Sequence, residues 1–144
     1  MMKINLGLRF PGTCEEAFEF YRSVFGGELI KLQRYKEMRE HGYEVAAGDE
    51  NKLAFVGLAL GENMLLGGDD YTESSGQQYI QGNNCTIEVR VDTKEEADRV
   101  FHALSAGGVI KMPLGDVYWG EYCGYFTDKF GVSWGVTCHC SQAA

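Results

Sequence analysis

The sequence lacks any apolar run that approaches the roughly 20 residues of a membrane-spanning helix, and its first residues, MMKINLGLRF, lack the apolar core of a signal peptide. Basic residues are also scarce, because 13 lysines and arginines face 21 aspartates and glutamates and give a formal net charge of −8. Binding to nucleic acid or to an anionic membrane requires a basic surface. We therefore expect a cytoplasmic protein with no nucleic-acid partner and no membrane partner.

The five cysteines form no CxxC motif, and their number is odd. Both features disfavour a disulfide framework, and reduced thiols are the default for a cytosolic protein. Cys138, His139 and Cys140 have the residue types of a metal clip, but their place at the end of a predicted strand favours a structural tail. No histidine is predicted near Cys85 or Cys123, so neither thiol has a base that would make it a nucleophile.

The same helix start occurs twice in the chain. TCEEA at 13–17 returns as TKEEA at 93–97, a spacing of 93 − 13 = 80 residues. In each copy a glutamate follows the threonine by three positions, which is the capping-box pattern. Apolar residues then recur at helical spacing until a glycine pair ends the helix, at 26–27 and at 107–108.

Alternation of apolar and polar residues predicts a strand before each helix, at 4–10 and at 85–91. Further strands are predicted after the helices, at 28–34, 53–60 and 63–67 and then at 109–114, 122–127 and 132–138. The order is β-α-β-β-β twice, so the sequence predicts an α+β fold made by internal duplication.

The duplication predicts a single domain of residues 1–144 with two modules, about 1–68 and about 84–140, and a polar connecting loop at about 69–83. One module alone leaves a sheet face uncovered. We expect the modules to pair into an extended curved mixed sheet with the helices on its outer face. The other face would then be a concave, partly polar trough, which is a usual place for a small-molecule site.

Tandem βαβββ modules resemble the vicinal oxygen chelate superfamily, which includes glyoxalase I, extradiol dioxygenases and the bleomycin and fosfomycin resistance proteins. The segments that carry the resemblance are FPGTCEEAFEFYRSVFGGE at 10–28, VDTKEEADRVFHAL at 91–104 and MPLGDVYWGEYCGYFTDKFGVSW at 112–134. The DKFGVSW part is a specific mark of the PhnB-like branch. The resemblance implies a glyoxalase-like fold and a homodimer, in which sheet edges would be covered.

Members of this superfamily that use a metal hold it with His, Glu or Gln at four places. The resemblance carries these places onto Asn5 or Leu6, Gly57, Thr86 and Gly135. None of these residues is a good ligand for a divalent cation, and the three histidines lie in separate predicted segments. We therefore expect no cofactor, and a divalent metal is disfavoured.

Strand alternation that turns Thr86 toward the trough also turns Glu88 and Arg90 toward it. Asn5 and Arg9 are expected to join them from the first strand. Because an arginine binds a carboxylate or a phosphate with two hydrogen bonds, Arg9 or Arg90 would hold an anionic or zwitterionic ligand. The alternative is an Arg–Glu pair that satisfies only itself.

Aromatic residues supply the second element of the predicted site. The segment DVYWGEYCGYF at 116–126 places four rings near the expected trough mouth, and Trp119 and Tyr122 are the ligand-binding candidates. The alternative for each ring is core or dimer packing. Trp134 is expected in the core, and Asp128 is expected in a structural turn before the last strand.

Three hypotheses for the function follow from this pattern. The first is a metal-free, PhnB-like protein that binds a small anionic or aromatic organic molecule. The second is a glyoxalase-type lyase or isomerase, with or without a divalent metal, in which Glu88 is the candidate general base. A third is a fold kept only for dimer assembly. Methyltransferase activity is not expected, because no Gly-rich turn follows the first strand to seat a nucleotide cofactor.

Overall fold

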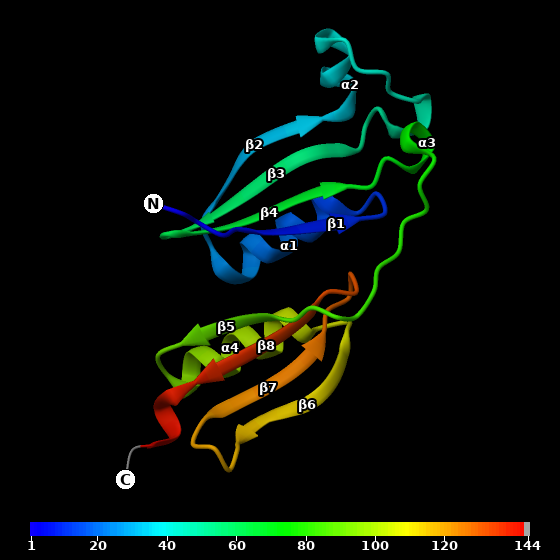
Figure 1. The fold of residues 1–144 in the computed structure, drawn as a ribbon. Coiled ribbons are helices and arrows are strands. Elements are labelled where there is room, and N and C mark those ends of the chain that lie inside the picture. The colour runs from blue at the N-terminus through cyan, green and yellow to red at the C-terminus, as the bar shows by residue number, and fades with distance from the viewer. Residues whose placement is uncertain (143–144) are drawn as a thin grey trace. The chain divides into compact units, whose positions relative to one another are not determined.

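The computed structural model describes residues 1–142, apart from the side chains of Thr72, Ser141 and Gln142. The chain divides into two units, Met1–Gln81 and Gly82–Ala144. Each unit has one long helix against one face of a four-stranded mixed sheet (Figure 1). The α+β class and the repeated β-α-β-β-β order are therefore confirmed. No helix within residues 1–142 is long and apolar enough to cross a membrane.

Unit 1 contains β1 (Leu6–Phe10), α1 (Cys14–Phe25), β2 (Glu28–Arg34), β3 (Leu53–Leu60) and β4 (Asn63–Asp69). The strand order is β1-β4-β3-β2, with β1 parallel to β4 and the other pairs antiparallel. The segments without periodicity hold short helices: α2 (Tyr35–Met38), η1 (Arg39–His41) and η2 (Ala47–Asp49) before β3, and α3 (Thr72–Ser75) after β4.

Unit 2 repeats the arrangement with β5 (Ile87–Val91), α4 (Lys94–Ser105), β6 (Val109–Asp116), β7 (Tyr122–Thr127) and β8 (Ser133–Cys138). A short 3-10 turn, η3 (His139–Gln142), follows. The strand order β5-β8-β7-β6 and the parallel β5–β8 pair match unit 1.

The registers make the two arginines of the predicted site equivalent. Arg9 of β1 lies opposite Gly68 of β4, and Arg90 of β5 lies opposite Thr137 of β8. By the same correspondence, the residue equivalent to Gly135 of β8 is in β4, at position 66. Gly57 of β3, which the resemblance supplied for unit 1, is therefore not the structural equivalent of Gly135.

One face of each sheet is buried under its helix. In unit 1, Phe18 of α1 packs edge-on against Phe10 with ring centres 6.2 Å apart, and it covers Gly67 so closely that a Cβ there would overlap its ring. In unit 2, Phe101 of α4 packs edge-on against Phe126 at 5.1 Å. Residues that alternate with these turn to the opposite face. This helix-free face is formed by Gly7, Arg9, Gly57, Leu66 and Gly68 in unit 1 and by Glu88, Arg90, Tyr125, Gly135 and Thr137 in unit 2.

The start of α4 has half of the predicted capping box. The Thr93 hydroxyl accepts a hydrogen bond from the Glu96 amide at 3.1 Å. The Glu96 carboxylate does not return to the cap, because it binds the Arg99 guanidinium at 2.8 Å.

The predicted capping box at the start of α1 is wrong. Thr13 makes no side-chain cap. The carboxylate of Asp69, at the end of β4, accepts hydrogen bonds from the amides of Gly12 and Cys14 at 3.1 and 2.8 Å. A carboxylate from a distant strand therefore satisfies the N-terminal amides that the local pattern assigned to a threonine.

The two caps predict different losses from the same substitution. Thr93→Ala is expected to lower the free energy of unfolding by about 1 kcal/mol, because it removes an N-cap acceptor. Thr13→Ala is expected to change it by less than about 0.5 kcal/mol, as for a surface substitution. Urea unfolding of both variants measures the difference. Equal losses would contradict the assignment of the α1 cap to Asp69.

Candidate functional site

The predicted ligand-binding residues divide between the units. Asn5 and Arg9 belong to unit 1, whereas Thr86, Glu88, Arg90, Trp119 and Tyr122 belong to unit 2. Asn5 and Thr86 are exposed and immediately precede β1 and β5, so both strands begin later than the alternation predicted. Each group is described within its own unit.

Glu88 and Arg90 lie on the helix-free face of unit 2 and pair with each other, with Oε1 and Nη2 3.4 Å apart. Arg90 also lies 3.6 Å from Oε1 of Glu121, and the same oxygen lies 3.1 Å from Nε2 of His139. The indole N–H of Trp119 donates to the other oxygen of Glu121 at 3.1 Å. Arg90 therefore lies between two carboxylates that compensate its charge.

Sequence reasoning missed Glu121 and His139. Glu121 immediately precedes β7 and shares the alternation of Cys123 and Tyr125, so it falls on the helix-free face once the register of β7 is fixed. His139 opens η3 directly after β8, and its contact with Glu121 at 3.1 Å places it beside this face. The alternation was therefore available in the sequence for Glu121, whereas no strand pattern could have placed His139.

Tyr122, predicted as a ligand-binding ring near the trough mouth, lies instead on the helix-covered face of β7. Its hydroxyl donates to Oδ1 of Asp98 in α4 at 2.6 Å, and the Lys94 ammonium lies 5.0 Å from its ring centre. The hydrogen bond to Asp98, together with burial, raises the pKa of Tyr122 to about 12. Tyr122 is thus a contact between strand and helix.

No cysteine described on this face is a reactive nucleophile. Cys138 and Cys140 form a disulfide with Cα atoms 5.2 Å apart, so the default of reduced thiols does not hold for this pair. Cys14, Cys85 and Cys123 are free. Burial raises the pKa of the Cys14 and Cys123 thiols, so both are neutral near pH 7 and unreactive.

Arg9 has a different environment from its equivalent in unit 2. Its Nη1 donates to the main-chain oxygen of Asp69 at 3.4 Å, and its guanidinium carbon lies 5.6 Å from the ring centre of Tyr71. In the part of the chain that the structure describes, no carboxylate lies within ion-pair distance of Arg9. The Arg9 guanidinium is therefore exposed and held in place, but no carboxylate neutralises its positive charge.

Two further tyrosines border Arg9. The Tyr35 hydroxyl donates to the main-chain oxygen of Asp69 at 2.8 Å, and the Tyr35 ring centre lies 5.4 Å from that of Tyr71. The Tyr79 hydroxyl donates to the main-chain oxygen of Arg9 at 3.2 Å. Burial raises the pKa of Tyr35 and of Tyr79, so both phenols keep their protons near pH 7.

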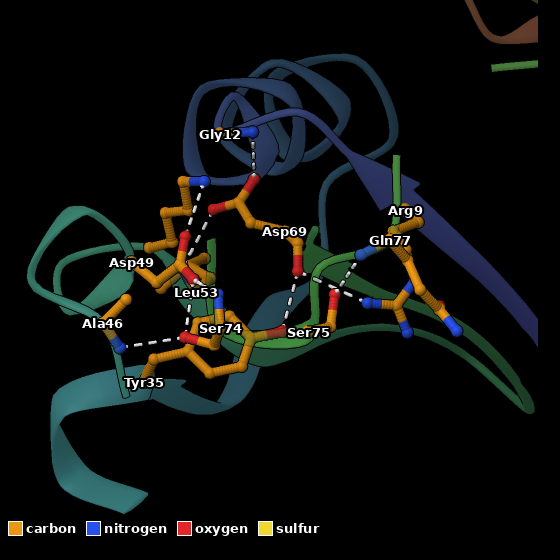
Figure 2. A network of polar contacts seen from close by, with 11 residues as sticks. Arg9, Gly12, Tyr35, Ala46, Asp49, Leu53, Asp69, Ser74, Ser75 and Gln77 are labelled. Carbon is orange, nitrogen blue, oxygen red and sulfur yellow. Dashed lines mark hydrogen bonds and ion pairs between the residues drawn. The ribbon is translucent and has the colours of Figure 1, made fainter. Parts of the chain in front are cut away.

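The buried carboxylate of Asp49 binds Ser74 of α3 (Figure 2). Asp49 accepts hydrogen bonds from the Lys52 ammonium at 2.9 Å and from the amide and hydroxyl of Ser74 at 2.8 and 2.7 Å. The Ala46 amide donates to the same Ser74 hydroxyl at 2.9 Å. Burial alone would raise the pKa of Asp49, but the hydrogen bonds from Ser74 and Lys52 lower it below its ordinary value. These contacts hold α3, and with it Tyr71, against the segment before β3.

The positions that the resemblance assigns to metal ligands do not fit a metal. Gly57 and Gly135 have no donor, and side chains cover both: Ile30 lies 3.1 Å from a Cβ built at Gly57, and Tyr125 lies 2.6 Å from one built at Gly135. Leu66, the equivalent of Gly135, is apolar. Within residues 1–142, no three His, Cys, Asp or Glu side chains are grouped to hold a metal ion.

Comparison with known proteins matches the chain to the 3-demethylubiquinone-9 3-methyltransferase family over residues 2–137. Protein PA1353 from Pseudomonas aeruginosa is 34% identical with a TM-score of 0.86, over 97% of this chain and 99% of that one. The PhnB protein from Bacillus cereus is 30% identical with a TM-score of 0.76, over 95% and 99%. A glyoxalase/bleomycin resistance protein/dioxygenase family enzyme from Burkholderia phytofirmans PsJN, 16% identical with a TM-score of 0.62 over 93% and 95%, shares the fold. The chain therefore belongs to the 3-demethylubiquinone-9 3-methyltransferase family, to which the PhnB protein is also assigned, and it shares its fold with a glyoxalase/bleomycin resistance protein/dioxygenase family enzyme.

Proposed function

We propose that this protein is a metal-free binder of a small organic anion and that Arg9 anchors the anionic group. One observation carries the proposal. Of two equivalent arginines, Arg90 is compensated by Glu88 and Glu121, whereas the groups beside Arg9 are a carbonyl oxygen, the ring of Tyr71 and the side chain of Tyr35, none of which is a carboxylate. A guanidinium without a carboxylate partner keeps N–H donors for a carboxylate or a phosphate.

The surroundings of Arg9 favour a ligand with an apolar or planar part. The rings of Tyr35 and Tyr71 lie beside the guanidinium, and aromatic rings of this kind stack on planar or apolar groups. On the same helix-free face, Ile30 and Met64 are half-buried around Gly57. We therefore propose a small organic acid as the ligand class, and we keep the cytoplasmic homodimer as part of the same proposal.

The family description names a methyltransferase, but several features favour binding over methyl transfer. Neither sheet has the doubly wound parallel order that seats nucleotide cofactors. At the turn from β1 to α1, the amides of Gly12 and Cys14 bind the Asp69 carboxylate. The helix N-terminus is thus engaged internally and is not offered to an anionic cofactor.

The test compares the two arginines. We expect Arg9→Gln to weaken binding of 3-phenylpropanoate, measured by calorimetry, by about tenfold, which is about 1.4 kcal/mol. Arg90→Gln is the matched control and is expected to change the affinity by less than about twofold. Equal losses in both variants would contradict the assignment of the anchor to Arg9, and no binding to the wild type would contradict the proposed function.

A lyase or isomerase is the second candidate, and the Glu121–His139 pair favours it. A carboxylate 3.1 Å from a histidine nitrogen orients the ring for proton transfer. Glu88, the predicted general base, is half-exposed and paired with Arg90, so His139 is the better-placed group.

Metal content separates the metal-free proposal from a metal-dependent enzyme. We expect elemental analysis of tag-free protein to find less than about a tenth of a metal ion per chain. Saturation with Zn²⁺, Ni²⁺, Mn²⁺ or Fe²⁺ should leave the melting temperature unchanged, since a ligand that binds the native state raises it. A stoichiometric metal would favour the enzyme.

A further inference from the structure

Two adjacent aspartates at the end of β4 have opposite environments. Asp69 accepts hydrogen bonds from three amides, those of Gly12, Cys14 and Leu53. Asp70 is only 9% exposed, and its Oδ2 is buried with no hydrogen-bond partner. Among the side chains described in residues 1–142, this is the only nitrogen or oxygen atom in that state. Because a buried carboxylate oxygen without a donor is costly, this atom is a candidate acceptor for a donor group of a ligand.

Asp70 faces the same corner of unit 1 as Arg9. Its amide donates to the Phe10 oxygen at 2.6 Å, which continues the pairing of β1 with β4 by one residue. Since Asp69 turns its carboxylate to α1, alternation turns the Asp70 side chain to the helix-free face. Tyr79 joins the two residues: its hydroxyl binds the Arg9 oxygen at 3.2 Å, and the Asp70 charge contributes, after burial, to the raised pKa of Tyr79.

Arg9 and Asp70 border one corner without pairing. No ion pair between them occurs in the described part of the chain, although each has the charge that the other would accept. The Arg9 guanidinium can therefore bind an anionic group of a ligand, and the Asp70 carboxylate can bind a cationic one. A ligand with one charge of each sign binds both, and an ammonium also neutralises the buried carboxylate, which a neutral hydroxyl does not.

We propose that the ligand is a zwitterionic amino acid, whose carboxylate binds Arg9 and whose ammonium group binds Oδ2 of Asp70. Its side chain would contact the rings of Tyr35 and Tyr71. This inference rests on the proposed function, because it takes Arg9 as the anchor of the anionic group. It adds the second charge of the ligand and the residue that selects it.

The test uses three matched probes: L-phenylalanine, 3-phenylpropanoate without the ammonium, and 2-phenylethylamine without the carboxylate. We expect the wild type to bind L-phenylalanine about tenfold more tightly than either analogue by calorimetry. Asp70→Asn is expected to abolish the preference over 3-phenylpropanoate and to leave the affinity for 3-phenylpropanoate unchanged. Arg9→Gln is expected to weaken both.

The outcomes separate the two claims. If Asp70→Asn leaves the affinity for L-phenylalanine unchanged while 3-phenylpropanoate still binds through Arg9, the zwitterion inference is overturned and the proposed function stands. If the wild type binds neither acid at about 10 mM, both are overturned.

Thermal unfolding separates a ligand contact from a structural role. Asp70→Asn removes a buried charge that has no partner, so its melting temperature is expected to equal or exceed that of the wild type. Asp69→Asn, the neighbouring control, is expected to lower the melting temperature. A comparable loss in both variants would assign Asp70 to the fold and overturn the inference.

Discussion

Asp69→Asn is expected to lower the free energy of unfolding by about 3 kcal/mol. Asp69 is 2% exposed, and both carboxylate oxygens are engaged: Oδ1 accepts the amides of Gly12 and Cys14, and Oδ2 accepts the amide of Leu53 at 2.9 Å. An asparagine has the same shape but turns an NH₂ group toward at least one of these donors. The variant therefore leaves no cavity, and its loss measures the unsatisfied amides at the start of α1 or β3.

Urea unfolding followed by circular dichroism measures this loss. The slope of the free energy against urea concentration should be unchanged, because the surface exposed on unfolding is unchanged. Asp70→Asn is the matched control at the next residue. An Asp69→Asn variant as stable as the wild type would contradict the role of this carboxylate as the cap of α1.

Asp128→Asn is expected to cost a similar amount, about 3 kcal/mol, in unit 2. The carboxylate is 3% exposed and closes the turn between β7 and β8. Its Oδ1 accepts the amides of Phe130 and Val132 at 2.8 and 3.0 Å, and its Oδ2 accepts the indole N–H of Trp134 at 2.8 Å. The structural turn and the core position of Trp134 that the sequence predicted are thus confirmed.

A double-mutant cycle with Trp134→Phe isolates the indole contact. We expect the two losses to be non-additive by about 1 kcal/mol, because either substitution alone already breaks the Asp128–Trp134 hydrogen bond. Urea unfolding of the single and double variants measures the coupling. Additive losses would show that the carboxylate acts only on the turn amides.

Local pattern predicted the elements of the fold well, because helical and strand periodicities are set by which face each residue buries. The strands at 28–34, 53–60 and 122–127 match the structure residue for residue. Long-range contacts escaped the same reasoning. Thr13 has the local pattern of a cap, yet the cap is Asp69, 56 residues later by 69 − 13, and no periodicity records that distance.

The contrast between the arginines was present in the sequence but required the register to be seen. In unit 2, Glu88 precedes Arg90 by two residues and faces the same side, whereas the equivalent residue before Arg9 is Gly7. One strand therefore supplies a carboxylate to its arginine and the other supplies none. Asp70, Tyr71 and Tyr79 could not be placed in advance, because their segment has no periodicity and is held by the distant contact of Asp49 with Ser74.

The most direct test of Arg9 as the anion anchor is to follow the side-chain Nε–H resonances of Arg9 and Arg90 by nitrogen-15 NMR while 3-phenylpropanoate is added to the wild type. Both arginines are then observed in one unmodified molecule. We predict a saturable shift at Arg9 with little change at Arg90, whose charge Glu88 and Glu121 already compensate. A saturable shift at Arg90 with none at Arg9 would contradict the proposed function.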